Sequence, residues 1–187
     1  RPKEDAVSNI KLKGRDALRE KFVVVDLETT GLSPEKNAII EIGAVKYEAG
    51  EAEYASMEAV INPEVYIPEV ITRITGITND MVKDCGIIEE ELPHFIDFFE
   101  DLPLAIFNAP FDMGFLKKNA LKIGAAIDNP VIDVLPLSRK AFPALPNHKL
   151  VTLKARFGIR VDQSHRALVD CQTTLSVYNE CIKKMFG

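Results

Sequence analysis

Four acidic residues and one histidine have the types and positions that could carry out chemistry. They are Asp26, Glu28, Asp112, His165 and Asp170, and each stands beside a predicted helix or strand. Carboxylate oxygens are preferred ligands of hard divalent cations, and a histidine can exchange a proton near neutral pH. This combination, in this order, indicates metal-assisted hydrolysis of a phosphodiester.

Asp26 and Glu28 follow directly on the apolar run Phe22-Val23-Val24-Val25. Residues two apart on a strand point to the same face, so the two carboxylates would lie side by side. Without a basic partner they repel each other, and burial increases the repulsion unless a cation lies between them. The alternative is that the strand has already ended and both are solvated loop acids, which is the commoner case for an isolated Asp-x-Glu.

Asp112 and Asp170 lie in the first turns of predicted helices, where an acid can simply complement the helix dipole. His165 has a similar alternative, as a residue that caps the final helix. Taken together with Asp26 and Glu28, however, the four acids form an all-oxygen ligand set. Such a set favours two ions of Mg²⁺ or Mn²⁺ over zinc. A histidine, with an ordinary pKa of about 6.5, could then accept the proton of the attacking water.

Two kinds of periodicity define the elements that must position these residues. Strands are expected over residues 22–27, 39–47, 54–61, 104–107 and 131–134, with a turn at 49–51. The first run is apolar and rich in β-branched residues, which is typical of a central strand buried on both faces. The first three strands have short connections and predict an antiparallel meander.

Helices are expected over residues 79–83, 89–100, 111–123, 135–142, 150–157 and 168–185. Thr78 is a suitable N-cap for the first of these, and Pro110 stands where the third would begin. Apolar residues recur every three or four positions through the last helix, giving a stripe that can dock on a sheet. Strands that alternate with helices after a meander predict an α/β fold, a mixed sheet with helices on both faces.

The composition limits the class of protein and of partner. A chain of 187 residues is expected to form one domain with a single core. Its formal net charge of −5 argues against a long phosphate footprint and predicts weak, end-directed binding of nucleic acid. Bound cations would reverse the local field, so a nucleic-acid substrate is still compatible with this charge.

Three cysteines without a Cys-x-x-Cys pair argue against a disulfide framework and against a zinc site. They fit a reducing compartment, and we expect a cytoplasmic protein. No apolar stretch is long enough for a membrane span, so no membrane partner is expected. Residues 1–20 are rich in charge and are interpreted as a leader or linker, with a processed or cloned terminus as an equal alternative.

Three segments resemble the motifs of the DEDD exonuclease superfamily, in its histidine-bearing branch. They are residues 22–32, residues 108–113 and residues 165–170, and the similarity extends over about residues 21–185. The order and the spacing of all three match. The stretch Asn147-His148-Lys149-Leu150 is similar to one in the exonuclease module of Gram-positive replicative DNA polymerases and in the related proofreading subunit. Cys171 stands where alanine is commoner, which is a change between small residues.

The resemblance implies a ribonuclease-H-like sheet in an exonuclease domain over residues 21–187, with two divalent ions. It implies that Asp26 bridges both ions, that Glu28 and Asp170 complete the first, and that Asp112 supports the second. It gives His165 the role of general base.

The resemblance also implies a set of substrate contacts. They are Thr29, Thr30, Gly31, Ile74, Asn108 and Phe111, and the segment 74–78 is similar to one that lies against the terminal nucleotide. Core packing is an equal alternative for Ile74 and Ile77, and for Phe111 it competes with stacking on a base. His148 is expected to be a surface residue or a support for its neighbours rather than a metal ligand.

These inferences predict a metal-dependent 3′→5′ exonuclease that releases 5′-mononucleotides from single-stranded or frayed DNA ends, in proofreading or repair. One alternative is an exoribonuclease on the same scaffold, because a pocket for the ribose 2′-hydroxyl is not legible in these residues. Another is an inactive binding or adaptor module, which the complete set of chemical residues disfavours. The chain could act alone, as a polymerase subunit, or joined to a polymerase or helicase domain.

Overall fold

A computed structural model describes residues 21–48, 55–161 and 165–187. It contains a five-stranded sheet in the order β3-β2-β1-β4-β5. The strands are β1 (Lys21–Thr29), β2 (Ile39–Glu48), β3 (Ser56–Val60), β4 (Leu104–Ile106) and β5 (Val131–Asp133). The β1–β2 and β2–β3 pairs are antiparallel, and the β1–β4 and β4–β5 pairs are parallel. The predicted meander with added parallel strands is therefore confirmed, while the turn at 49–51 and the leader at 1–20 lie outside the described residues.

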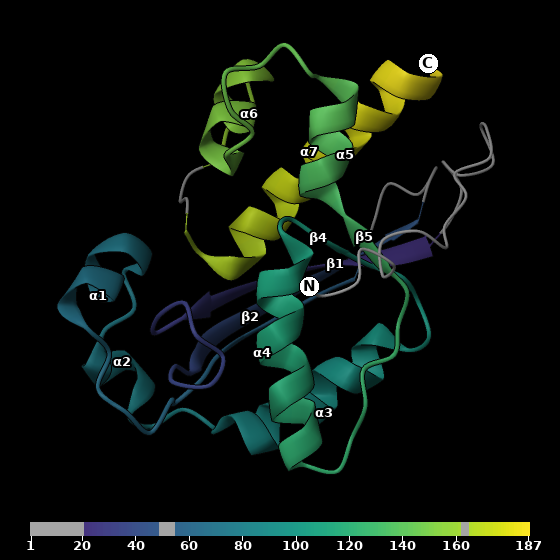
Figure 1. The fold of residues 1–187 in the computed structure, drawn as a ribbon. Coiled ribbons are helices and arrows are strands. Elements are labelled where there is room, and N and C mark those ends of the chain that lie inside the picture. The colour runs from purple at the N-terminus through teal and green to yellow at the C-terminus, as the bar shows by residue number, and fades with distance from the viewer. Residues whose placement is uncertain (1–20, 49–54, 162–164) are drawn as a thin grey trace.

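Helices cover both faces of this sheet, as Figure 1 shows. One face carries α3 (Ile88–Phe99) and α4 (Ala109–Lys122). The other carries α5 (Val134–Ala141), α6 (Leu150–Arg156) and α7 (Ala167–Phe186). The short helices α1 (Glu69–Thr75) and α2 (Asn79–Val82) lie together at one end of the sheet. The architecture is the expected ribonuclease-H-like α/β fold, and no helix in the described ranges is long and apolar enough to cross a membrane.

Strand β1 lies at the centre and is buried on both sides, as its sequence predicts. Val23 and Val25 belong to the core beneath α3 and α4, whereas Phe22 and Val24 belong to the core beneath α5, α6 and α7. The alternation follows from the period of two in a strand. It also means that every even-numbered side chain of β1 points toward the α7 face.

The boundaries of the six predicted helices differ from the observed ones by at most two residues. The Oγ1 atom of Thr78 accepts a hydrogen bond from the Met81 N–H at 3.2 Å, which confirms the N-cap of α2. Helix α1 was not predicted. Its sequence contains Val70, Ile71 and Ile74, and β-branched residues lower helix propensity, so a seven-residue segment of this kind gives no clear helical pattern.

Helix α7 lies unusually close to the sheet at its first turn. A Cβ atom placed on Gly43 of β2 would lie 2.6 Å from the carbonyl carbon of Ala167 and 2.6 Å from the nitrogen of Leu168. Only glycine permits this approach, because backbone atoms cannot yield as a flexible side chain would. Further along the helix, the predicted apolar stripe packs on the sheet through buried residues that include Cys171 and Tyr178.

Candidate active site

All five candidate catalytic residues line one open cleft of about 600 Å³. The cleft lies where the carboxyl end of β1 meets the first turns of α4 and α7 and the connection between α5 and α6. Three segments that are far apart in the sequence thus bring Asp26, Glu28, Asp112, His165 and Asp170 together.

The tightest group consists of Asp26, Glu28 and Asp170. Each offers a carboxylate oxygen, and these oxygens all lie within 4.8 Å of one another. Asp26 and Glu28 occupy even-numbered positions of β1 and therefore face α7, on which Asp170 lies one turn from the start. The alternative of two solvated loop acids is wrong, since both residues lie within the strand and are partly buried.

Asp112 enters the same cleft from the first turn of α4 and is 4 % exposed. The Leu27 N–H donates a hydrogen bond to its carboxylate, which ties α4 to the end of β1. Its Oδ2 atom is buried and has no hydrogen-bond partner among the described residues, and the same is true of Oδ2 of Asp26. Two buried acceptors without partners are costly, so they point to a ligand that is not part of the protein chain.

The electrostatics of the cleft confirm that the acids oppose one another. Burial is the main cause that raises the pKa of Asp26 well above its ordinary value, and the charges of Asp112, Glu28 and Asp170 add to it. Burial and the charge of Asp170 raise the pKa of Glu28 from 4.5 to about 9. Burial also raises the pKa of Asp112, against the Leu27 hydrogen bond, and that of Asp170. Because these pKa values are raised, we expect cations that bind to the acids to displace protons from them.

These residues fit a site for divalent metal ions, on the evidence of the structure itself. The donors are all oxygens, and the Oδ2 atoms of Asp26 and Asp112 are buried without a hydrogen-bond partner among the described residues. Asp26, Glu28 and Asp170 form one group close enough to share an ion, and Asp112 lies beside them in the cleft. Hard cations prefer such oxygen ligands.

The N-cap of α7 is Arg166 and not His165, so the capping alternative is wrong for this histidine. Its backbone adopts a left-handed conformation with φ of 63°, and its N–H donates to Oδ1 of Asp170 at 3.3 Å. The side chain is exposed and lines the cleft. The backbone is thus held against one of the acids, while the imidazole remains accessible to a substrate.

A buried ion pair anchors the segment that carries His165 and Asp170. Glu41 of β2 is 1 % exposed, and its Oε2 accepts hydrogen bonds from Nε and Nη2 of Arg166 at 2.9 and 2.6 Å. Its Oε1 accepts the N–H of Ala167, the first residue of α7, at 2.6 Å. Glu41 therefore caps α7 from the neighbouring strand, because the first N–H groups of a helix have no partner within it. Together with Gly43, it sets where the first turn of α7 sits above β1.

The sequence contains one indication of this ion pair, although the residue concerned lies outside the three motif segments. Glu41 interrupts the apolar run of residues 39–45, and a charged residue is almost never fully buried without a partner. The identity of that partner depends on the register of β1 and β2, which places Glu41 opposite Glu28. Arg166 could be recognised only once α7 was placed over this pair.

The predicted substrate contacts separate into two groups. Asn108 and Phe111 line the cleft, and the left-handed backbone of Asn108 opens α4. Thr29 donates a hydrogen bond to the Gly31 carbonyl at 2.7 Å, and Thr30 accepts one from the Ala38 N–H at 3.0 Å, so both hydroxyls hold the turn after β1. Gly31 is tightly packed, since a Cβ there would lie 2.6 Å from the Asn37 side chain.

Ile74 and Ile77 lie in different environments. Ile77 is fully buried, so the core-packing alternative is confirmed for this residue. Ile74 is 48 % exposed on α1 and does not line the cleft. A contact of Ile74 with a nucleotide stays a prediction, as do the contacts of Thr29, Thr30 and Gly31.

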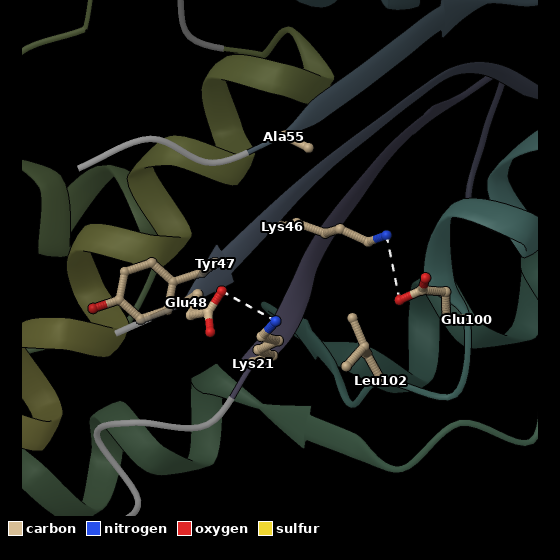
Figure 2. Close-up of a pocket in the computed structure, with 7 residues that line it drawn as sticks. All are labelled: Lys21, Lys46, Tyr47, Glu48, Ala55, Glu100 and Leu102. Carbon is tan, nitrogen blue, oxygen red and sulfur yellow. Dashed lines mark ion pairs between the residues drawn. The ribbon is translucent and has the colours of Figure 1, made fainter. Parts of the chain in front are cut away.

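A second cavity, of about 320 Å³, lies at the opposite end of β1 (Figure 2). Its two lysines are paired with acids. Lys21 lies 3.2 Å from Glu48, and Lys46 lies 3.5 Å from Glu100. Among the described residues that line this cavity, the charged side chains are thus paired, in contrast to those of the acidic cleft.

Comparison with known proteins identifies the family. Residues 23–178 match the RNase T family, described as an exonuclease, and the chain belongs to this family. It is 38% identical over 182 residues to the PolC-type DNA polymerase III of Caldanaerobacter subterraneus subsp. tengcongensis, covering 97% of this chain and 13% of that protein. It is 40% identical over 170 residues to the PolC-type DNA polymerase III of Clostridium perfringens, covering 91% of this chain and 12% of that protein. The chain thus spans about an eighth of these polymerases, and the predicted resemblance is confirmed.

Solved structures share the fold. A structure of exonuclease X in complex with 5′ overhanging duplex DNA has a TM-score of 0.71 at 24% identity, over 88% of this chain and 92% of that one. The zinc-bound complex of E. coli exonuclease I with single-stranded DNA has a TM-score of 0.77 at 18% identity, over 89% of this chain and 41% of that one.

The raised pKa of Glu28 predicts how stability depends on pH when metal is absent. The folded protein keeps a proton up to about pH 9 that the unfolded chain releases above about pH 4.5, so the free energy of unfolding falls as the pH rises through this window. Urea unfolding in chelator should show this decline, and Glu28→Gln should reduce its slope. The exposed Glu89→Gln is the matched control and should leave the slope unchanged. Equal slopes in the wild type and in Glu28→Gln would contradict the prediction.

The anchor between Glu41 and Arg166 predicts a loss of both stability and metal affinity. Glu41→Ala leaves a half-buried guanidinium and the Ala167 N–H without partners and should cost about 2–3 kcal/mol in urea unfolding. Binding of Mn²⁺, measured by calorimetry, should weaken because Asp170 loses its fixed position. Glu58→Ala, which removes an exposed acid on the neighbouring strand, is the control for a general change of charge. Unaltered Mn²⁺ affinity in folded Glu41→Ala would show that the anchor does not position the metal ligands.

Proposed function

We propose that this domain is a metal-dependent 3′→5′ exonuclease that hydrolyses the last phosphodiester of a DNA strand and releases a 5′-mononucleotide. The observation that carries the proposal is the cluster of four opposed carboxylates in one open cleft, two of which have a buried oxygen without a partner among the described residues. Membership of an exonuclease family supports hydrolysis at a chain end. The domain over residues 21–187 is proposed as the unit that carries the activity.

The proposed cofactors are two divalent cations, Mg²⁺ or Mn²⁺. Bound there, such ions would polarise the phosphoryl group and stabilise the attacking and leaving oxygens. Asp26, Glu28, Asp112 and Asp170 would hold them, and the family resemblance supports Asp26 as the residue shared between both. The four acids would hold the cations in place, and the cations would offset the negative charge of the cleft so that a phosphodiester can approach.

His165 is proposed to accept the proton of the attacking water. Its imidazole is exposed in the cleft, and its backbone is fixed against Asp170 by the 3.3 Å hydrogen bond. A general base must lie within hydrogen-bond reach of the attacking water, and histidine is the side chain that most often takes this role. Asn108 and Phe111 line the cleft near the acids and are proposed to contact the terminal nucleotide.

DNA is the proposed substrate because of the relatives. The polymerases that share 38–40% identity are named as DNA polymerases, and two structures of the same fold hold DNA. We propose that the domain proofreads or repairs DNA ends, linked to a polymerase as in the longer relatives, in the cytoplasm. Residues 1–20 would then form a leader or linker.

The substrate and its polarity can be measured on end-labelled oligonucleotides. With Mn²⁺ or Mg²⁺, 5′-labelled DNA should shorten progressively from its 3′ end. A mismatched end should be cut faster than a matched one, because less free energy is needed to unpair it. Asp26→Ala should abolish cutting. RNA of the same sequence is the test for the exoribonuclease alternative. Early release of the 5′ label as a mononucleotide, or action on RNA alone, would overturn the proposal.

The role of His165 has its own test. His165→Ala should lower the rate by roughly a hundredfold or more, and the rise of the wild-type rate with pH through the histidine range should disappear. Affinity for Mn²⁺ should change little, because the imidazole is not among the proposed ligands. His94→Ala, an exposed histidine on α3 outside the cleft, is the control. An unchanged pH–rate profile in His165→Ala would remove this residue from the role of base.

A further inference from the structure

The cleft is divided by charge. Its acidic half consists of residues from β1, α4 and α7, and the other half consists of residues from α5 and the connection to α6. Among the described residues that line it, the cations of this second half are Arg139 and Lys149. Both are exposed, and neither forms an ion pair with the described part of the chain. Arg156 and Lys140, on the same two helices, do not line the cleft.

The α5–α6 connection is braced by side chains of the Asn147-His148-Lys149-Leu150 stretch. Nε2 of His148 donates a hydrogen bond to the carbonyl of Phe142 at 2.9 Å, because a carbonyl oxygen can only accept. Oδ1 of Asn147 accepts from the Lys149 N–H at 3.1 Å and from the Thr152 hydroxyl at 2.7 Å. Lys149 is the N-cap residue of α6, so these bonds fix the backbone from which its side chain extends.

The half of the cleft that contains Arg139 and Lys149, here called the basic wall, is also connected to the acidic half, the acidic wall. Oδ1 of the buried Asp133 accepts the N–H of Asn108, at the start of α4, and the N–H of Leu135, at the start of α5, both at 3.1 Å. The helix that carries Asp112 and the helix that carries Arg139 therefore begin from one shared carboxylate. This holds the two walls at a defined separation across the cleft.

We propose that Arg139 and Lys149 bind a phosphodiester of the strand that is retained after cleavage, next to the scissile one. A strand that ends in a 3′-hydroxyl carries no phosphate beyond its terminal phosphodiester, so any further phosphate in the cleft belongs to the retained side. That phosphate is repelled by the acidic half and attracted by the two cations opposite. His148 and Asn147 act as positioning residues for this wall.

This inference rests on the proposed function, and two substrates allow the inference and the function to be tested separately. The p-nitrophenyl ester of thymidine 5′-monophosphate has one phosphodiester and no retained strand. A single-stranded DNA oligonucleotide has a scissile phosphodiester and also a retained strand with further phosphates. Arg139→Gln and Lys149→Gln should lower kcat/KM on the oligonucleotide at least tenfold more than on the ester. The double variant should lower the slope of log kcat/KM against log salt by about 0.7 for each phosphate that it no longer neutralises. Lys140→Gln, next to Arg139 but outside the cleft, should match the wild type on both substrates.

His148→Ala tests the brace, and it should reproduce the selective loss on the oligonucleotide without changing affinity for Mn²⁺. Circular dichroism and the melting temperature confirm that each variant is folded. Equal losses on both substrates, or no loss on either, would overturn the proposed subsite while leaving the exonuclease intact. A wild type that hydrolyses neither substrate with Mn²⁺ would overturn the proposed function, and this subsite would fall with it.

Discussion

Repulsion among buried carboxylates is the constraint on which the rest of the structure depends. Asp26, Glu28 and Asp170 bring carboxylate oxygens within 4.8 Å of one another, and Asp112 adds a fourth charge from the side. Such a cluster destabilises the folded chain unless protons or cations compensate it. The surrounding protein therefore has to hold the acids together from several directions, and the hydrogen bonds of Glu41 and Asp133 contribute to this.

Each acid is held by an element that is fixed elsewhere. The central position of β1 fixes Asp26 and Glu28, and the Leu27 N–H and the shared Asp133 fix the start of α4. The first turn of α7 is held by Glu41 and by the close approach at Gly43. These supports explain why a charged residue is buried in β2 and why a glycine is needed two residues later. The same frame places the basic wall of α5 and α6 across the cleft from the acids.

The residues that the structure brings together in the acidic cleft could be predicted from the sequence, because the signals for them are local. Asp26 and Glu28 share a strand with an apolar run, and Asp112 follows Pro110 at the start of its helix. Asp170 lies in the first turn of a helix with a clear apolar stripe, and the order of the motifs matches a known family. The pairing of Glu41 with Arg166 could not be predicted, because it joins residues 125 positions apart and depends on strand register. Helix α1 was missed since its β-branched residues favour a strand locally and tertiary packing decides otherwise. Thr29 and Thr30 belong to the first motif, yet their hydroxyls hold a turn, a distinction that needs coordinates.

If the acidic cleft is built for metal, cations must take the place of protons when they bind. The number of protons released on binding of Mn²⁺ at pH 7 measures this exchange, and calorimetry in buffers of different ionisation enthalpy gives that number. Since the pKa of Glu28 is raised to about 9, we expect release of at least one proton per protein, and a smaller release from Glu28→Gln. Binding of Mn²⁺ without any proton release, or equal release from the wild type and Glu28→Gln, would contradict this exchange of protons for cations.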